Sequence, residues 1–329
     1  MNVLVTGGAG FIGCNLVRRL LKEGAYVCVF DNFSTGKRNN LSDLQVADSI
    51  PARNSPQLPI SSAPLAQLDV FEGDLRDFAL ILEATKDIEM VFHEAALPSV
   101  IRSVKAPNTT NDVNIAGTLN LLEACKVNKV KRVIYASSSS IYGDSEELPK
   151  REDMIPYPMS PYAVSKLAGE HYMRVFHHLY GIETVILRYF NVYGPYQDPT
   201  SEYSGVISKF ITAFIKGLPI TVYGDGEQSR DFTYVDDVVE ANILAADAPV
   251  SGEIFNVAGG NRYSLNQMIE ILKGIFNKKD YEITYSDPRP GDVRHSQADV
   301  GRVRKALDFS ARISFDDGLH ETVDWYKRI

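Results

Sequence analysis

Short apolar runs alternate with longer amphipathic stretches along the first 190 residues of the chain. The runs predicted to be strands are residues 3–5, 27–30, 90–93, 133–136 and 184–187, with a further strand near Val70-Phe71. The stretches predicted to be helices are residues 15–23, 78–85, 113–126 and 161–180. This alternation predicts an α/β protein with a Rossmann-type, doubly wound parallel sheet that binds its ligand at the carboxyl ends of the strands.

The pattern changes twice along the chain. Residues 42–68 are dominated by Ser, Pro, Ala and Gln, which indicates a surface insertion before the third strand. Beyond Asn191 the alternation becomes irregular, although residues 264–276 and 315–327 read as amphipathic helices. We expect residues 1–189 to form the dinucleotide-binding domain and residues 190–329 a smaller α/β substrate domain, with a segment near 233–259 returning to the first domain.

A glycine-rich turn joins the first predicted strand to the first predicted helix. The strand ends in Thr6 and is followed by Gly7-Gly8-Ala9-Gly10-Phe11-Ile12-Gly13. Such glycines let backbone N–H groups approach a pyrophosphate, which then faces the positive end of the helix dipole. Asp31 ends the second strand, where a carboxylate accepts ribose hydroxyls and repels a 2′-phosphate, so we predict NAD. Lys37 and Arg38 could instead hold a 2′-phosphate, but a solvated loop is the favoured reading.

Composition and charge exclude several classes of protein. The chain has 329 residues, is 44% hydrophobic and 23% charged, and carries a net charge of −8. Negative charge and the lack of a basic run argue against nucleic-acid binding. No apolar stretch approaches the ~20 residues of a membrane span. We therefore expect a cytoplasmic protein that binds neither nucleic acid nor membranes.

Neither the cysteines nor the histidines form a metal motif. Cys14, Cys28 and Cys125 are scattered and fall in predicted helices or strands, which predicts buried thiols. His93-Glu94 begins like a zinc-protease helix, but Leu97 stands where the second histidine is required. We expect no metal.

Tyr162 and Lys166 lie four residues apart in a predicted helix, so their side chains share one face. The spacing alone is common. Its position matters more, because the helix follows the strand end Ser137-Ser138-Ser139-Ser140, whose hydroxyls would face a nicotinamide. Free tyrosine has a pKa of about 10, and a neighbouring lysine cation lowers it. The residues predict an alcohol–ketone redox site in which Tyr162 is the base and Ser138 hydrogen-bonds the reacting oxygen.

The motifs together resemble those of one enzyme family. They are Thr6-Gly7-Gly8-Ala9-Gly10-Phe11-Ile12-Gly13, Asp31-Asn32-Phe33-Ser34-Thr35-Gly36, Tyr162-Ala163-Val164-Ser165-Lys166, Arg188-Tyr189-Phe190-Asn191, Arg230-Asp231-Phe232 and Arg289-Pro290-Gly291-Asp292. Over essentially its full length the chain resembles the extended short-chain dehydrogenase/reductase family. Within that family it is most similar to the UDP-hexose 4-epimerases, especially the bacterial type that acts on UDP-N-acetylglucosamine. The resemblance implies transient oxidation at C4 of the sugar, rotation of the 4-keto sugar, and return of the hydride by NAD that stays bound.

The resemblance also implies which residues contact each ligand. The implied NAD contacts are Gly7, Gly10, Phe11, Ile12, Gly13, Asp31, Asn32, Ser34, Thr35, Gly36, Asp74, Leu75, Ala95, Ala96, Asn114, Tyr162, Lys166 and Tyr189. Asp74 also lies at the end of a predicted strand, where its carboxylate could receive a hydrogen bond from the adenine amino group. For the substrate, Asn191 would lie near the phosphates and Arg230 and Arg289 would clamp them. Asp292 would hold the uridine ribose, and Val222-Tyr223 would face the uracil. The remaining implied substrate contacts are Ser99, Ser138, Ser139, Tyr162, Val206 and Ser296.

Differences between this sequence and those of related enzymes narrow the choice of reaction and substrate. Sugar-nucleotide 4,6-dehydratases carry an Asp-Glu pair, and UDP-glucuronate decarboxylases a glutamate, where this chain has Ser139 and Ser140. Epimerisation is therefore favoured. Epimerases restricted to UDP-glucose have a bulky tyrosine at the place of Ser296. A serine leaves room for an N-acetyl group, which predicts UDP-N-acetylglucosamine and UDP-N-acetylgalactosamine as substrates, with UDP-glucose and UDP-galactose also accepted.

Two alternatives stay open. A UDP-glucuronate 4-epimerase would need a cation for the sugar carboxylate, for which Arg102 or Arg294 is available. A non-catalytic NAD- or nucleotide-sugar-binding sensor belongs to another class of protein. Such sensors typically lose the catalytic residues, whereas Ser138, Tyr162 and Lys166 are all present.

Members of this family commonly form dimers through two helices of each subunit. The corresponding segments here are residues 113–126 and 161–180, with Ile115, Leu119 and Leu122 as apolar surface. Packing against the chain's own sheet explains part of this apolarity. We expect a homodimer.

Overall fold

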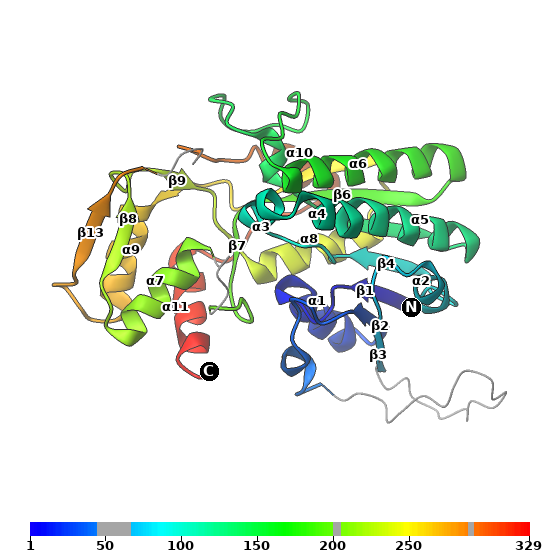
Figure 1. Cartoon of the computed structure of the whole chain (residues 1–329), viewed down its shortest axis with the longest axis horizontal. Helices are drawn as coiled ribbons and strands as arrows, with labels where there is room; N and C mark the ends of the chain where they lie inside the picture. The colour runs from blue at the N-terminus through cyan, green and yellow to red at the C-terminus, as the bar shows by residue number, and fades with distance from the viewer. Residues whose placement is uncertain (45–66, 200–204, 289–292) are drawn as a thin grey trace.

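The chain folds into a larger and a smaller lobe in a computed structural model that describes residues 1–44, 67–199, 205–288 and 293–329 (Figure 1). A seven-stranded sheet forms the centre of the larger lobe. Its strands are β1 (Asn2–Thr6), β2 (Tyr26–Asp31), β3 (Leu68–Glu72), β4 (Met90–His93), β5 (Arg132–Ser138), β6 (Glu183–Tyr189) and β11 (Glu253–Val257). All paired strands of this sheet run parallel. The predicted Rossmann-type fold is confirmed.

The order of the strands marks the ligand-binding edge. Across the sheet the order is β11-β6-β5-β4-β1-β2-β3. The chain therefore builds outward from β1 on one side and then reverses from β4 on the other. In open parallel sheets a crevice forms outside the carboxyl ends of the strands at this point of reversal. The first glycine turn follows β1, and His93-Glu94 follows β4, so both lie at the crevice.

Two layers of helices cover the sheet. One face packs against α1 (Phe11–Lys22), α8 (Val235–Asp247) and α10 (Gly301–Leu307). The other face packs against α2 (Phe78–Ala84), α5 (Gly117–Val127) and α6 (Pro161–Tyr180). The strands are apolar on both faces because both faces are buried. Cys14, Cys28 and Cys125 are free and buried within these layers, as the sequence predicts.

The smaller lobe has its own core. Its strands pair as β7 (Val192–Tyr193) with β10 (Thr233–Tyr234), β8 (Ile220–Tyr223) with β13 (Ile283–Ser286), and β9 (Ser229–Arg230) with β12 (Tyr263–Ser264). Its helices are α7 (Val206–Lys216), α9 (Leu265–Ile275) and α11 (Phe315–Tyr326). Each helix presents an apolar stripe at helical spacing, and the stripes meet around Phe315, whose ring stacks on Phe232 and Tyr263 at centroid distances of 5.0 and 4.4 Å.

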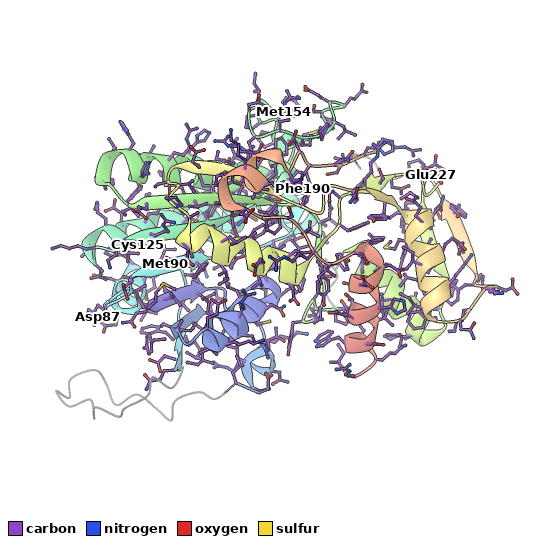
Figure 2. All side chains as sticks on the ribbon, turned by 180° about the vertical axis from the view of Figure 1, so that it is seen from behind. Asp87, Met90, Cys125, Met154, Phe190 and Glu227 are labelled. Carbon is purple, nitrogen blue, oxygen red and sulfur yellow. The ribbon has the colours of Figure 1, made fainter. Side chains whose placement is uncertain are left out.

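The chain crosses between the lobes more than once. It leaves the larger lobe after Phe190, and α8 and β11 bring it back before the C-terminal helices. Figure 2 shows the molecule from behind, with Cys125 on the larger lobe, Phe190 near the junction and Glu227 on the smaller lobe. No helix in the described ranges is both long enough and apolar enough to span a membrane.

Several predicted elements need correction. Helix α1 begins at Phe11 rather than residue 15, because Gly13 lies inside the helix and not in the turn. The helix predicted to start at residue 113 is preceded without a break by α4 (Pro107–Asn111) and a π-helical turn, η2 (Asp112–Ala116). The polar run at 108–112 has no apolar period, so only Pro107 at the first helical position marks this start.

Smaller elements and one surface expectation also differ. The segment after Pro98, which is not among the predicted helices, forms α3 (Val100–Lys105). Two 3₁₀ turns are η1 (Arg38–Leu41) and η3 (Ser139–Tyr142). Leu122, expected to supply dimer surface, is fully buried against the sheet. Of the predicted insertion, residues 45–66 lie outside the described residues.

Candidate active site

The glycine turn between β1 and α1 is closed to any side chain. Gly7 has φ +69°, and a Cβ there would lie 2.7 Å from the backbone of Ala95. A Cβ on Gly13 would lie 2.2 Å from the carbonyl oxygen of Gly7. Gly10 is the N-cap of α1 and offers no side-chain cap, so the first-turn N–H groups at Phe11 and Ile12 have no helical partner. This glycine cradle and uncapped helix end fit a bound pyrophosphate.

Asp31 ends β2 beside this turn and is almost fully buried. Its two carboxylate oxygens accept hydrogen bonds from the N–H groups of Ala9 and Phe33 at 3.0 and 2.8 Å. Burial raises the pKa of Asp31, and these two N–H donors lower it. A Cβ on Gly36 would lie 2.8 Å from the carboxylate, so the 31–36 segment wraps closely around it. Ser34 and Thr35 belong to this segment.

The basic residues after this segment are paired with acids. Lys37 lies 2.8 Å from Asp198. Arg38 lies 2.5 Å from Glu72, and its guanidinium stacks over the Phe33 ring. The charge of each is thus balanced locally, which favours NAD over a cofactor with a 2′-phosphate.

Asp74 lies just beyond β3 with part of its carboxylate exposed. It accepts hydrogen bonds from the guanidinium of Arg76 at 2.9 and 2.8 Å and from the Asn32 side chain at 2.8 Å. Arg76 holds the pKa of this carboxyl well below its usual range. Leu75, the next residue, is buried. An ionised Asp74 can still accept a hydrogen bond from an amino group.

The predicted catalytic residues come together at the carboxyl end of β5. Ser160 caps α6 by accepting from the N–H of Ala163, and Pro161 begins the helix. Tyr162 is partly buried and hydrogen-bonds the hydroxyl of Ser138. The ammonium of Lys166, whose side chain is almost fully buried, donates to the carbonyl oxygen of Ala136 at 2.7 Å. One helix and one strand end thus hold all three groups.

Burial opposes ionisation of both residues on α6. Burial raises the pKa of Tyr162 to about 12, although the hydrogen bond to Ser138 lowers this pKa in part. Burial lowers the pKa of Lys166 to about 8, although the carboxylates of Glu94 and Glu170 raise this pKa in part. A cation placed beside Tyr162 would stabilise its phenolate, which is the chemistry that a bound oxidised nicotinamide supplies.

Other predicted cofactor residues lie between these groups and the glycine turn. Ala95 and Ala96 follow β4, and the backbone of Ala95 touches Gly7. Asn114, in the π-helical turn, accepts from the N–H of Leu97 at 2.8 Å and donates to the hydroxyl of Ser165 at 3.0 Å. Asn114 therefore fastens the loop after β4 to the catalytic helix, and its side chain already has protein partners.

A cavity of about 570 Å³ opens in the smaller lobe. Four predicted substrate residues line it, namely Asn191, Val206, Tyr223 and Arg230. Asn191 has a left-handed backbone, with φ +34°, and donates to the carbonyl oxygen of Asp231 at 3.0 Å. Tyr189 is the last residue of β6 in the larger lobe, and Asn191 lies in the segment that leads from β6 to this cavity.

Four predicted substrate residues need revision or lie outside the described part of the chain. The side chain of Val222 is fully buried in the core of the smaller lobe and does not line the cavity, because side chains alternate along β8 and Tyr223 takes the cavity side. Ser99 is a buried cap of α3 that accepts from the N–H of Arg102 at 3.0 Å. Arg289 and Asp292 lie outside the described residues.

Ser139 and Ser296 are both partly buried. Ser139 begins the 3₁₀ turn η3 after β5. The N–H of Ser296 donates to the carbonyl oxygen of Ser229 at 3.0 Å, which ties the 296 segment to the strand that carries Arg230.

Among the polar residues that sequence reasoning missed at these sites are Gln228, Lys209 and Glu94. Gln228 and Lys209 line the cavity, and Gln228 has a buried side-chain oxygen without a hydrogen-bond partner among the described residues. Glu94 lies beside the catalytic groups and receives a hydrogen bond from Tyr189. Gln228 and Lys209 belong to irregular or helical segments with no motif. Glu94 was considered only as part of a failed metal motif.

The fold and this site define a Rossmann-type dinucleotide-binding enzyme of the short-chain dehydrogenase/reductase class. Residues 3–258 match the NAD dependent epimerase/dehydratase family. The chain belongs to that family, which uses NAD, and the resemblance read from its motifs is confirmed at this level.

Proteins similar to the chain include several nucleotide-sugar epimerases. A UDP-glucose 4-epimerase of Mycolicibacterium smegmatis is 36% identical over 328 residues, which cover 99% of each chain. A solved UDP-N-acetylglucosamine 4-epimerase from Methanobrevibacter ruminantium, in complex with UDP-N-acetylmuramic acid, is 40% identical with a TM-score of 0.89 and covers 99% of this chain and 98% of its own. The UDP-glucuronic acid 4-epimerase of Bacillus cereus, with UDP-glucuronic acid and NAD bound, is 33% identical with a TM-score of 0.87 and covers 100% of this chain and 99% of its own.

Proposed function

We propose that the chain catalyses the NAD-dependent 4-epimerisation of a UDP-hexose. The observation that carries this proposal is the grouping of Tyr162, Ser138 and Lys166 at the end of β5, in the same lobe as the glycine cradle. Bound NAD would take up hydride from C4 of the sugar and return it to the opposite face. The cavity of the smaller lobe would hold the UDP group while the sugar reaches Tyr162.

Each catalytic side chain has a defined task in this proposal. Tyr162 removes the proton of the C4 hydroxyl and later returns it. Lys166, fixed on the carbonyl oxygen of Ala136, stabilises the Tyr162 phenolate by its charge. Ser138, already hydrogen-bonded to Tyr162, would hold the same sugar oxygen. General acid–base transfer of this kind contributes typically ~10²–10⁴-fold to a rate.

The cavity supplies contacts for the UDP group. Arg230 and Asn191 would bind the phosphates, together with Arg289. Tyr223 would pack against the uracil. The side-chain oxygen of Gln228, which has no hydrogen-bond partner within the described part of the chain, is available to accept its N3–H. Asp292 remains our prediction for the uridine ribose.

An N-acetylated hexose is the substrate that we favour. A serine at position 296 leaves space that a tyrosine would fill. The competing reading, a UDP-glucuronate epimerase, would use Arg294 or Arg102 for the sugar carboxylate. Arg294 instead donates two hydrogen bonds to the carboxylate of Asp225, at 2.8 and 2.7 Å, so its charge is already balanced. This contact favours the uncharged sugars.

We further propose that the lobes divide the two ligands, with NAD on residues 1–189 and the segment near 233–259, and the UDP-sugar on residues 190–329. The homodimer stays a prediction supported by α6, whose exposed face carries Val164, Val175 and Leu179. A cytoplasmic location also stays a prediction.

Proton NMR tests the function directly. Purified protein is mixed with UDP-N-acetylglucosamine without added cofactor, and the galacto epimer is expected to appear. Parallel samples with UDP-glucose and UDP-glucuronate rank the sugars, and faster conversion of UDP-glucuronate would select the competing substrate. No conversion of any of the three, with NAD added, would remove the protein from the epimerases.

A further inference from the structure

Glu94 places a carboxyl group at the carboxyl end of β4, in the larger lobe. It follows β4, where His93 lies opposite Tyr135 of the parallel strand β5. Glu94 is therefore level with Ala136, whose carbonyl oxygen accepts the ammonium of Lys166 at 2.7 Å. Its backbone also lies against the glycine turn, because a Cβ on Gly7 would be 3.1 Å from the carbonyl carbon of Glu94.

One neutral side chain, which a second one fixes in turn, holds this carboxyl group in place. The hydroxyl of Tyr189 is 2.8 Å from the Glu94 carboxylate and within 3.1 Å of both polar atoms of the Asn242 amide. A phenol has one proton. Since the Asn242 amide nitrogen donates to the Tyr189 oxygen at 2.8 Å, the Tyr189 proton points to Glu94. Asn242 is itself fixed, because its nitrogen donates to the carbonyl oxygen of Val238 and it is fully buried.

The electrostatic partners of Glu94 are the two catalytic residues on α6. Burial raises the pKa of Glu94 to about 7, while the Tyr189 hydrogen bond and the Lys166 charge lower it. In return, the Glu94 carboxylate raises the pKa of Lys166 and that of Tyr162. His93 on the same strand is neutral near pH 7, because burial lowers its pKa to about 3. Glu170 also acts on Lys166, but it is already paired with Arg188.

We propose that Glu94 is a positioning residue of the proton-transfer site, a carboxylate held by Tyr189 and Asn242 that acts on the sugar only through Lys166 and Tyr162. Its negative charge keeps Lys166 protonated and limits how far the Tyr162 phenolate is populated. The inference rests on the roles proposed above for these two residues. The inference makes Glu94 a third ionisable group of the proton-transfer site, besides Tyr162 and Lys166.

The variant Glu94→Gln keeps the shape of the side chain and removes the charge. Without the carboxylate, Tyr162 ionises more readily and Lys166 loses its proton more readily. Both limbs of the kcat pH profile are therefore expected to move to lower pH, by roughly one unit. A side chain that only supported the fold would change the rate at all pH values without moving the limbs.

Two variants serve as controls. Glu94→Asp keeps the charge, and its limbs are expected to lie closer to those of the wild type than the limbs of Glu94→Gln. Glu83→Gln removes an exposed carboxylate on α2 that pairs with Lys86, and it is expected to leave the profile unchanged. Equal shifts in Glu94→Asp and Glu94→Gln would overturn the proposal, as would a Glu94→Gln profile that coincides with that of the wild type.

A second measurement does not depend on turnover. Carbon-13 NMR of protein labelled at the glutamate carboxyls identifies the Glu94 resonance by its loss in Glu94→Gln. That resonance is expected to titrate at higher pH in Lys166→Met than in the wild type, because the cation that stabilises the carboxylate is gone. Titration at the same pH in both proteins would refute the coupling. If the wild type does not epimerise any UDP-hexose, the proposed function fails, whereas this titration still decides whether Glu94 and Lys166 interact.

Discussion

The carboxylate of Glu170 accepts two hydrogen bonds from the guanidinium of Arg188, at 2.9 and 2.7 Å, and both side chains are only 2% exposed. Glu170 stands one helical turn beyond Lys166 on α6, and Arg188 lies on β6. The Glu170 carboxylate also accepts from Ser137 on β5, and Arg188 donates to the hydroxyl of Tyr142 at 2.8 Å. This buried network ties the catalytic helix to the two strands beneath it.

Removing one member of this pair leaves an unpaired buried charge. We expect Arg188→Met to lower the free energy of unfolding by about 3–5 kcal/mol. Urea denaturation followed by circular dichroism measures the change. Arg151→Met breaks an exposed contact with Glu147 and is expected to change the free energy of unfolding far less, because solvent screens an exposed ion pair. If Arg188→Met and Arg151→Met lowered the free energy of unfolding equally, the buried pair of Arg188 and Glu170 would not be a source of stability.

Tyr162→Phe removes the proposed base and leaves the ring. Turnover measured by NMR is expected to fall by roughly 10²–10⁴-fold, while the NAD content of the purified protein stays that of the wild type. Tyr157→Phe, at an exposed position in the preceding loop, is the matched control and should retain full activity. A Tyr162→Phe protein with wild-type turnover would rule out the proposed mechanism.

Gly13→Ala tests the cofactor cradle. The new methyl group would lie 2.2 Å from the carbonyl oxygen of Gly7, so the turn must open. We expect the NAD recovered from the purified protein, measured by absorbance after extraction, to drop at least tenfold. Gly274→Ala is also inside a helix, and apart from its own helix turn no atom of a described residue lies within 4 Å of the new Cβ, so this variant should keep its NAD. Retention of NAD by Gly13→Ala would place the dinucleotide elsewhere.

Ser296→Tyr tests the room for the N-acetyl group. The variant is expected to lower kcat/KM for UDP-N-acetylglucosamine by roughly tenfold or more, while kcat/KM for UDP-glucose changes little, because only the larger sugar would meet the added ring. Coupled assays of the two substrates give the ratio, and Ser296→Ala is the control for loss of the hydroxyl. An unchanged ratio in Ser296→Tyr would contradict the assignment.

The larger lobe was largely predictable from the sequence. Its strands are continuous apolar runs, and the residues 90–93 and 161–180 were predicted with the bounds found for β4 and α6. The turn at Gly7 was predictable because a residue with a side chain cannot come so close to the backbone of Ala95, so the position requires glycine. Polar helices without an apolar stripe, such as α4, carry no periodic signal, and only Pro107 at its first position marks the start of α4 in the sequence.

The smaller lobe was less predictable. Its strands are as short as two residues, such as Thr233–Tyr234, and a period of two cannot be recognised over that length. Side-chain direction was missed for the same reason at Val222, which was expected at the uracil and lies in the core. Glu94 shows a further limit, since its role depends on Tyr189 and Asn242, which are distant in sequence and meet it only in the fold.

The late return of the chain to the large sheet has a consequence for synthesis of the protein. While the ribosome extends the chain, β6 remains an open edge until Glu253–Val257 has emerged and paired with it. An open strand edge is a template for pairing with other chains. Between completion of β6 and arrival of β11 the nascent protein is therefore open to aggregation at this edge, and a fragment that ends at residue 189 would keep the edge permanently.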